Sequence, residues 1–345
     1  MAATAVPTLR RRTLLSGGAF RFAVAILAGC AFVTHVTPAT AAQRPATPAS
    51  QGVFVQVSTL GPTFSPAQVQ AWMERICAGR QVVLQDVAGQ DGRLFTTYLD
   101  VIAPYLPGGS KACFTKVFVG TVDLAWTGTG SKYSEGVQDA AFQERYLAMS
   151  NTAARAFVGR YPRTKVNWYL TYEANLNLLY YPEVHKAYRS MLATEMRNLR
   201  SIRAGSTMWS PTFAYPYSDY SSNVAGMTQL RANLINLFGT WGATAGGLQV
   251  LNLQDFVAGS ACDPAWNQTT PEDAVGWVNF LGSLGQVPTV QLNVEQYSFD
   301  CDAGTIGPGN AGELAARTSF YRSLNVALGP AFEIRYWMPA NGFSL

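Results

Sequence analysis

Short apolar runs alternate with longer amphipathic segments along most of this 345-residue chain. The intervals between the runs are long enough for a loop, a helix and a return loop. We predict strands at Val53–Val57, Gln81–Asp86, Lys116–Thr121, Val166–Tyr172, Ser206–Pro211, Leu248–Gln254, Thr289–Val294 and Phe332–Trp337. The predicted helices are Ser65–Ala78, Gly136–Tyr161, Pro182–Ile202, Thr228–Trp241, Pro271–Leu284 and Ala311–Ala327. Eight strands that alternate with helices imply a parallel sheet closed into a (β/α)8 TIM barrel.

An open, doubly wound sheet is the alternative arrangement for the same alternation of elements. Such folds often carry a glycine-rich phosphate-binding turn after a strand, and no GxGxxG or GxxxxGK[ST] motif follows any predicted strand here. We therefore favour the barrel, and we expect residues 52–345 to form one large α/β domain.

The first 42 residues have the features of an export signal rather than of the folded domain. Arg10–Arg12 precede an apolar stretch at Phe22–Val33, and the small residues Ala39–Ala41 offer a cleavage site. Paired arginines before an apolar stretch suggest twin-arginine export. A membrane anchor is the less favoured interpretation, because the apolar stretch is too short to cross a bilayer. Residues 43–51 are rich in Ala, Pro and Ser and are predicted to be a linker.

A second interpretation of the same leader involves lipid attachment. Leu27–Cys30 resembles a bacterial lipobox, which would leave a lipid-modified Cys30 at the mature N-terminus. We expect a secreted protein, with a lipid anchor at the outer face of the cell membrane as the alternative. Membrane association is expected only in the second case.

The charge of the chain lies in this leader. The whole chain has a formal net charge of +4, and the first 42 residues contain four arginines and no acidic residue. The mature chain is therefore close to neutral, so no excess of basic residues indicates binding to nucleic acid or to an anionic membrane.

The numbers of cysteines and histidines limit the kinds of site that this chain can form. Besides the cysteine of the leader, the chain has Cys77, Cys113, Cys262 and Cys301, and an even number in an exported protein favours disulfides. We favour the pairs Cys77–Cys113 and Cys262–Cys301, although spacing does not prove the connectivity. The mature chain has one histidine, His185, which we expect on a helix surface. No metal site or cofactor is predicted, so carboxylates must carry any acid/base work.

Three carboxylates directly follow predicted strands: Glu173, Asp255 and Glu295. The carboxyl ends of the strands form the catalytic face of a TIM barrel. By strand alternation, Glu173 shares the inward face with Tyr169, and Glu295 shares it with Asn293. Asp255 follows Gln254, which has the inward parity, so Asp255 points away unless the strand ends in a bulge. We expect Asp255 either to cap the following segment or to support or bind the substrate.

Aromatic side chains cluster after the same strands. Trp126, Tyr215, Tyr297 and Trp337 are candidates for contact with sugar rings, which pack their C–H faces on aromatic planes. The alternative is that these side chains fill the core and brace loops.

Short motifs in a fixed order resemble those of a known family. They are Gly52–Gln56, Lys116–Gly120, Trp168–Glu173, Ser210–Phe213, Leu253–Asp255 and Asn293–Glu295. This set, which runs along nearly the whole mature chain, is similar to the DUF4434 family of proteins related to TIM-barrel glycosidases. The resemblance implies a glutamate acid/base after the fourth strand and a second glutamate after the seventh, which correspond to Glu173 and Glu295.

The same motifs contain Gln56 and Asn293, which we expect to bind substrate. Related retaining enzymes usually have asparagine before the acid/base glutamate, whereas this chain has Tyr172. Any contact to the substrate 2-hydroxyl would then come from another residue.

These observations predict a monomeric, secreted glycoside hydrolase that acts on a polysaccharide or oligosaccharide. A retaining mechanism, which places the two carboxyl groups about 5–5.5 Å apart, is favoured over an inverting one. A non-catalytic carbohydrate-binding barrel of the cell envelope is the alternative. An esterase or deacetylase is disfavoured because no GxSxG motif is present.

Overall fold

The computed structural model describes residues 52–61, 63–258, 260, 268–301 and 305–334. The predicted signal peptide, lipobox and linker lie outside these residues, as do Cys262 and Trp337. Predictions that concern them therefore remain predictions.

Eight parallel strands form one sheet in the order β10-β1-β2-β3-β4-β5-β6-β7. Their bounds are β1 Gly52–Gln56, β2 Gln81–Gln85, β3 Lys116–Gly120, β4 Val166–Leu170, β5 Thr207–Trp209, β6 Val250–Gln254, β7 Thr289–Asn293 and β10 Pro330–Ala331. A parallel bridge between Leu292 and Leu328 brings the last strand back to β7 and nearly closes the barrel. The (β/α)8 prediction is confirmed.

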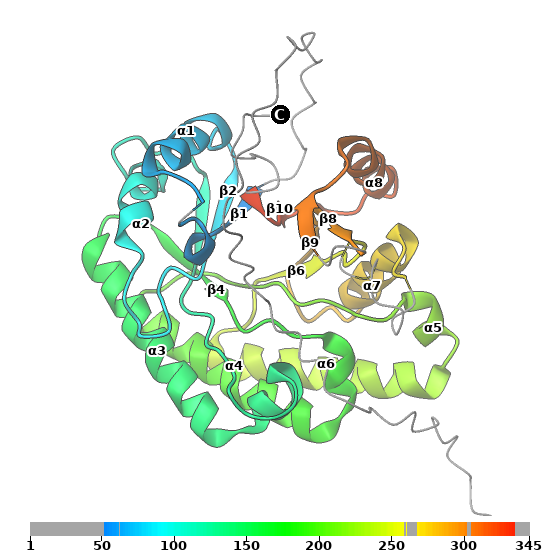
Figure 1. Cartoon of the computed structure of the whole chain (residues 1–345). Helices are drawn as coiled ribbons and strands as arrows, with labels where there is room; N and C mark the ends of the chain where they lie inside the picture. The colour runs from blue at the N-terminus through cyan, green and yellow to red at the C-terminus, as the bar shows by residue number, and fades with distance from the viewer. Residues whose placement is uncertain (1–51, 62, 259, 261–267, 302–304, 335–345) are drawn as a thin grey trace, which may run out of the picture.

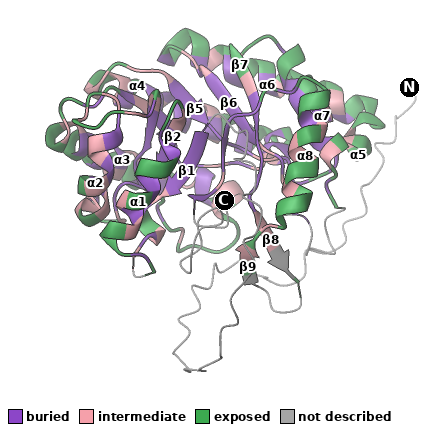
Figure 2. Cartoon of the chain, turned by 90° about the horizontal axis from the view of Figure 1, so that it is seen from above, coloured by how far each residue is buried: buried purple, intermediate pink, exposed green. Residues whose placement is uncertain are grey.

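Helices surround the strands on the outside of the barrel, as Figure 1 shows. They are α1 Pro66–Ile76, α2 Thr96–Ile102, α3 Ala140–Arg160, α4 Pro182–Ile202, α5 Tyr217–Ser221, α6 Val224–Ala245, α7 Pro271–Ser283 and α8 Ala311–Ser323. Single-turn helices η1 Val57–Thr59, η2 Ala103–Tyr105, η3 Lys132–Gly136 and η4 Leu176–Tyr180 lie in the loops. Figure 2 shows the buried strands in the centre and exposed helix faces at the periphery.

Local sequence signals fix where the helices start. In α1, the Ser65 side chain accepts a hydrogen bond from the Gln68 backbone, and Gln68 reaches back to Ser65. Thr270 and Asp273 form the same reciprocal pair at the start of α7. Both helices also have proline in their first turn, where no backbone donor is needed.

Strand alternation separates two apolar clusters. Phe54, Val83, Phe118, Tyr169, Met208 and Val250 form the cluster that fills the barrel interior. Phe54 and Tyr169 meet there edge to face, with ring centroids 5.3 Å apart. The alternate residues of the same strands, such as Trp168 and Leu170, pack outward against the helices in a second, larger cluster. The predicted parity of the fourth strand is therefore correct.

The structure differs from the prediction mainly in the loops and at the last strand. A two-stranded antiparallel hairpin, β8 Tyr297–Asp300 with β9 Thr305–Pro308, follows the seventh barrel strand and was not predicted. The short helices α2 and α5 were also missed, because one or two turns give little periodic signal. The last barrel strand ends at Ala331, so Phe332 and Glu333 follow the strand instead of forming it.

One predicted disulfide is confirmed. Cys77, at the end of α1, is bonded to Cys113, just before β3, with 5.4 Å between the two Cα atoms. The bond closes a loop of 36 residues and ties the second βα unit to the first. The second predicted pair, Cys262–Cys301, includes a residue outside the described part of the chain.

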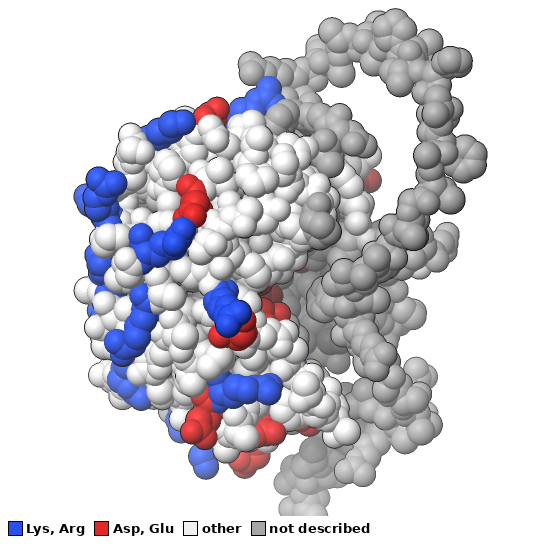
Figure 3. Space-filling view, turned by 60° about the vertical axis from the view of Figure 1, so that its left-hand side comes forward, with Lys and Arg blue, Asp and Glu red and all other residues white. Residues whose placement is uncertain are grey.

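The distribution of charge can be seen on one face of the molecule. On the face turned forward in Figure 3, charged side chains of both signs are separated by wide uncharged areas. Within the described residues, no helix is both long and apolar enough to cross a bilayer.

A buried carboxyl group lies between helices α3 and α4. Glu195 is 1% exposed, and its Oε1 accepts hydrogen bonds from the hydroxyls of Tyr146 at 2.8 Å and Ser150 at 2.9 Å. Burial raises the pKa of Glu195 from 4.5 to about 7, against the opposite effect of the two hydroxyls. Ionisation of this carboxyl group therefore lowers the free energy of unfolding of the protein.

Glu195→Gln is expected to stabilise the protein at alkaline pH. The wild type loses stability as the pH rises from about 4.5 to about 7, because the folded-state pKa lies above the unfolded one. The difference in unfolding free energy between the variant and wild type should shift by about 2–3 kcal/mol in favour of the variant from pH 4.5 to pH 8. Chemical denaturation at both values checks this. An identical difference at the two values would contradict it.

Candidate active site

Glu173 follows β4 at the carboxyl end of the barrel, as predicted. Its Oε1 accepts hydrogen bonds from the amide of Gln85 at 3.1 Å and from the hydroxyl of Tyr169 at 2.9 Å. Tyr169 belongs to the interior cluster, so the glutamate lies at the inner side of the mouth. The side chain is half-buried and still reaches solvent.

The surroundings of Glu173 favour its protonated form. Burial is the main cause that raises its pKa, and the negative charge of Asp123 adds to it. Hydrogen bonds from Gln254 and Tyr169 and the positive charge of Lys132 act in the opposite direction. A carboxyl group with a raised pKa at a barrel mouth is suited to donate a proton.

Glu295 follows β7 and is held as an acceptor. It is 1% exposed, its Oε2 accepts a hydrogen bond from the backbone of Ala258 at 3.1 Å, and its Oε1 accepts one from the Tyr297 hydroxyl at 2.8 Å. Hydrogen bonds of this kind stabilise a carboxylate more than a neutral carboxyl group. Glu295 is thus more buried than Glu173 and has a backbone N–H among its donors, whereas the donors to Glu173 are side chains.

Asp255 supports Glu295 from behind. It is 1% exposed and points away from the barrel interior, as its strand parity predicted. One oxygen accepts a hydrogen bond from the Glu295 backbone at 3.2 Å, and the other faces Arg317 at 3.4 Å and the Tyr321 hydroxyl at 3.1 Å. The structure thus gives Asp255 a position that supports Glu295, and a contact of Asp255 with substrate stays a prediction.

Strand β6 connects the two halves of the site. The Gln254 side chain lies close enough to Glu173 to lower the pKa of that group. The next residue, Asp255, holds the backbone of Glu295. Because β5 and β6 separate β4 from β7 in the sheet, the two glutamates lie on opposite sides of the mouth, with the end of β6 between them.

Sequence reasoning missed a fourth carboxyl group, Asp86. It follows β2, is 3% exposed, and has the left-handed backbone conformation (φ 54°) that non-glycine residues rarely adopt. Its Oδ2 lies 3.4 Å from the Ser58 hydroxyl and 3.5 Å from the Gln56 amide, and its Oδ1 has no hydrogen-bond partner among the described residues. The strand-end rule that identified the other three carboxylates would also have found this one.

The pKa of Asp86 is raised from 3.8 to about 8. Burial is the main cause, followed by the negative charge of Asp123; Glu173 also raises it, while Gln56 and Lys132 lower it. Asp86 is therefore neutral at pH 7 and becomes a second negative charge beside Glu173 at alkaline pH.

Asp86→Asn is expected to remove an inflection near pH 8 from the pH profile of kcat/KM of any reaction in which Glu173 transfers a proton. Ionisation of Asp86 in the wild type makes it harder for Glu173 to release its proton, and asparagine cannot ionise. Initial rates between pH 5 and 9.5 check this. A variant profile that keeps the inflection would assign it to another group.

Gln56 and Asn293 end β1 and β7 at the carboxyl side of the barrel but differ in exposure. Gln56 is half-buried, and its backbone N–H donates to the Glu333 carboxyl at 3.1 Å. Asn293 is 1% exposed, its Oδ1 accepts from the Phe332 backbone at 2.8 Å, and its Nδ2 lies 3.4 Å from the Ser210 hydroxyl. Asn293 thus joins neighbouring strands, and its contact with a substrate stays a prediction.

The predicted aromatic candidates separate into different roles. Trp126 packs edge to face on Phe142 of α3, with ring centroids 5.5 Å apart, and so braces the loop after β3. Tyr297 donates to Glu295 and belongs to the site. Tyr215 is 40% exposed on the loop after β5. Trp337 lies outside the described residues.

Two other sequence expectations can be placed. Tyr172, next to Glu173, is 1% exposed and packs outward against Tyr146 and Tyr188, so it takes no position in the mouth. His185 is 8% exposed, so the expected surface position of this histidine is wrong. It lies in the first turn of α4, where burial lowers its pKa.

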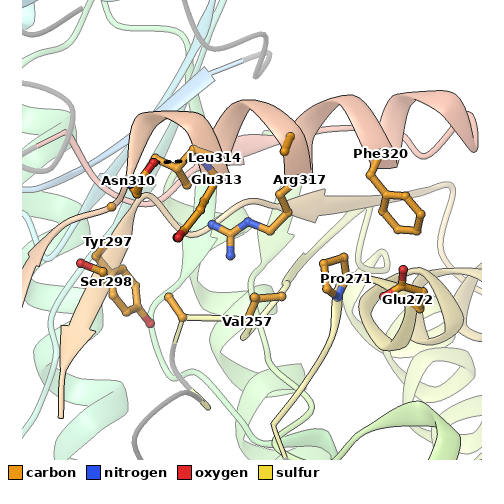
Figure 4. Close-up of a pocket in the computed structure, with 13 residues that line it drawn as sticks. Val257, Pro271, Glu272, Tyr297, Ser298, Asn310, Glu313, Leu314, Arg317 and Phe320 are labelled. Carbon is orange, nitrogen blue, oxygen red and sulfur yellow. Dashed lines mark hydrogen bonds between the residues drawn. The ribbon is translucent and has the colours of Figure 1, made fainter.

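A cavity of about 600 Å³ opens beside Glu295 (Figure 4). Ala258 and Tyr297, which hold the Glu295 carboxylate, form part of its wall, and α8 contributes Glu313, Arg317 and Phe320. The guanidinium of Arg317 points into the space between α8 and Val257. Two residues of the cavity wall are therefore the same residues that donate hydrogen bonds to Glu295.

Within the described residues, no group of three or more histidine, cysteine, aspartate or glutamate side chains could hold a metal ion. The carboxyl groups at the mouth are instead engaged by amides, hydroxyls and backbone N–H groups.

The fold and the mouth define a class of protein, a (β/α)8 barrel with carboxyl groups at the carboxyl ends of β2, β4, β6 and β7. Its fold is similar to that of glycoside hydrolases. No family model matches the chain, and no curated protein matches it by sequence.

Solved structures provide the closer comparison. A proposed alpha-L-fucosidase from Bacteroides thetaiotaomicron is 12% identical, with a TM-score of 0.56 over 88% of this chain and 93% of that chain. An intracellular xylanase from Thermoanaerobacterium saccharolyticum is 12% identical, with a TM-score of 0.45 over 82% of this chain and 84% of that chain. At this identity, the first comparison establishes the fold and leaves the reaction to be argued from the site.

Proposed function

We propose that this protein is a glycoside hydrolase in which Glu173 is the general acid/base and Glu295 the nucleophile. One observation carries the proposal: two hydrogen-bonded glutamates lie directly after the carboxyl ends of β4 and β7, at the same barrel mouth. Burial favours the proton on Glu173, whereas a backbone N–H and a hydroxyl hold Glu295 as an acceptor. Two carboxyl groups that differ in this way supply the acid and the nucleophile of glycoside cleavage.

The reaction would proceed in two steps. Glu295 attacks the anomeric carbon while Glu173 protonates the departing glycosidic oxygen, so that the sugar becomes an ester of Glu295 and the aglycone leaves as an alcohol. Glu173, now ionised, takes a proton from water, whose oxygen displaces Glu295 from the anomeric carbon. Both glutamates return to their starting states, and the anomeric configuration is retained.

The remaining elements of the proposal concern setting and substrate. The substrate is a polysaccharide or oligosaccharide, and no cofactor takes part. The leader supports secretion of the protein, with lipid attachment at Cys30 as the alternative. We propose that the protein acts as a monomer. The likeness of the sequence motifs to DUF4434 agrees with this assignment and remains part of the proposal.

A non-catalytic carbohydrate-binding barrel is the second candidate. Exposed tyrosines on the loops after β4 and β5 favour it, because they would bind sugar whether or not the glutamates cleave it.

A screen against bacterial and plant cell-wall glycans separates the two candidates. Wild type and Glu295→Ala are incubated with each glycan, and new reducing ends are measured. We expect reducing ends from at least one glycan with wild type and none with the variant. Sugar binding without turnover by wild type on any glycan would instead support the non-catalytic barrel.

A further inference from the structure

Exposed aromatic side chains gather on two neighbouring loops at the carboxyl ends of the strands. Tyr180 is 41% exposed and Tyr181 is 57% exposed in the loop between β4 and α4. Tyr215 is 40% exposed in the loop between β5 and α5. Burial of these rings elsewhere would stabilise the fold, so their exposure requires an explanation.

The rings form one group, which we call the tyrosine platform: Tyr180, Tyr181, Tyr215 and Tyr220. The ring centroids of Tyr180 and Tyr181 lie 5.8 Å apart, and those of Tyr215 and Tyr220 lie 6.1 Å apart. The two pairs lie on adjoining loops, since Asn177 of the first loop accepts hydrogen bonds from the backbone of the second. Two loops that are distant in sequence thus bring these tyrosines to the same end of the barrel.

A buried tryptophan of α7 supports the platform from below. Trp277 is 1% exposed, stacks on Phe213 with ring centroids 3.7 Å apart, and meets Tyr220 at 5.5 Å. Its indole N–H donates to the Tyr215 backbone at 2.9 Å. These contacts hold the second loop in one conformation.

The two loops are also fastened to each other. Asn177, 3% exposed, accepts hydrogen bonds through its Oδ1 from the backbone of Ala214 at 2.9 Å and of Tyr215 at 3.2 Å. Asn175 pairs with Thr212 in a parallel bridge. A surface that is ordered before binding loses little conformational entropy when a ligand arrives, as is typical of a binding site.

The position of the platform relates it to the proposed catalytic acid. Glu173 and Tyr180 lie in the same loop, and a fully extended chain between them would span at most about 25 Å. The platform is therefore on the mouth side of the barrel. One of its residues, Tyr220, belongs to α5, which is labelled in Figure 1. A ligand only a few sugar rings long could reach from the acid to the tyrosines.

We infer that the tyrosine platform is a distal subsite for a neutral polysaccharide chain whose glycosidic bond lies at Glu173 and Glu295. This inference rests on the proposed function and extends it to the class of substrate. Tyrosine offers an apolar ring face for sugar C–H groups and a hydroxyl for sugar hydroxyls. The platform side chains carry no charge at neutral pH, whereas a polyanion would call for arginine or lysine.

The test uses full-length protein and two readouts. Affinity electrophoresis in gels containing soluble xylan, mixed-linkage β-glucan or galactomannan measures polymer binding in a Glu173→Gln background. The rate of hydrolysis of short aryl glycosides, which are too short to reach the platform, measures the activity of the two glutamates alone. The variants are Tyr181→Ala, Tyr215→Ala and their combination, with Tyr→Phe at both positions to keep the rings. Leu324→Ala is the matched control, because Leu324 is 50% exposed and follows the end of α8, where the chain returns to the opposite side of the barrel.

We expect each Tyr→Ala change to weaken binding of at least one polymer roughly two- to tenfold, which is the effect of losing one aromatic contact. The double variant should lose more, the phenylalanine variants should keep most of the binding because they keep the rings, and Leu324→Ala should bind as wild type does. Rates on aryl glycosides should be unchanged in all of them.

Three results would overturn the inference: no binding to any of the polymers, binding that alanine leaves intact, or equal losses on polymers and aryl glycosides. Concentration-dependent self-association that disappears in the alanine variants would reassign the platform to contact between copies. The fate of the proposed function is separate. If binding depends on the platform but no glycan is cleaved, the subsite stands and the proposed hydrolase activity is wrong. If glycans are cleaved but binding does not depend on the platform, the hydrolase activity stands and the subsite is wrong.

Discussion

Glutamine in place of Glu295 is expected to abolish turnover, with kcat lowered by at least roughly 10⁴-fold. Glutamine preserves the size of the side chain, can accept the Ala258 hydrogen bond through its oxygen and can donate to the Tyr297 hydroxyl through its amide group, but it cannot form the ester intermediate. The change therefore removes the reaction step and leaves the shape of the mouth nearly intact.

Glu173→Gln should have a smaller effect that depends on the leaving group. Loss of the general acid lowers the rate roughly 10²–10⁴-fold on natural glycans, whose alkoxide leaving groups need a proton. Aryl glycosides with acidic phenols need little protonation, so their first step should be far less impaired. Added azide should then restore turnover by attacking the intermediate without help from a base.

Rates of reducing-end release and of phenol release measure both effects. Glu195→Gln is the matched control, because it makes the same substitution at a buried glutamate between α3 and α4, away from the mouth. Thermal unfolding of each variant establishes that the fold is retained. A folded Glu295→Gln variant with a rate within tenfold of wild type would reject Glu295 as the nucleophile.

Arg317→Met is expected to destabilise the protein by about 3–5 kcal/mol. The side chain of Asp255 is 0% exposed and that of Arg317 is 9% exposed, so the pair is buried, with 3.4 Å between Nε and Oδ2. Methionine fills similar space but leaves the aspartate charge in the interior without its partner. Arg317 also donates to the backbone carbonyl of Glu295, so the variant should loosen the support of the nucleophile.

The loss of stability should depend on pH. Burial raises the pKa of Asp255, and Arg317 lowers it. Removal of Arg317 therefore raises the folded-state pKa further above the unfolded value. The variant is then closest to wild type at acidic pH, where protonation of Asp255 removes the charge that Arg317 balances, and falls further behind as the pH rises.

Asp255→Asn combined with Arg317→Met provides the control, because it removes both charges. Urea unfolding at pH 4.5 and pH 7.5 compares the two variants with wild type. The double variant should recover a large part of the lost stability at pH 7.5. A single variant whose deficit is the same at both values would contradict an uncompensated charge as the cause.

Much of the fold follows from local patterns. Apolar runs at regular intervals and capping pairs such as Ser65–Gln68 define strands and helices before any tertiary contact is known. Strand alternation also places Tyr169 inside the barrel and turns Asp255 outward, because a strand has only two faces. Short loop elements escape this reasoning. Helix α5, for example, is held by Asp273 of a distant segment, which accepts a hydrogen bond from the Ser218 backbone and lies outside any local window.

The candidate site divides in the same way. The sequence by itself identifies Glu173 and Glu295, because residue type and position at a strand end are local properties. Only the tertiary structure distinguishes Asn293, which is buried and joins strands, from Gln56, which is half-buried. It also adds Asp86, whose pKa depends on burial and on Asp123 and Glu173 from other strands. Burial and charge proximity are sums over groups that are distant in the chain, so they exist only once the barrel has closed.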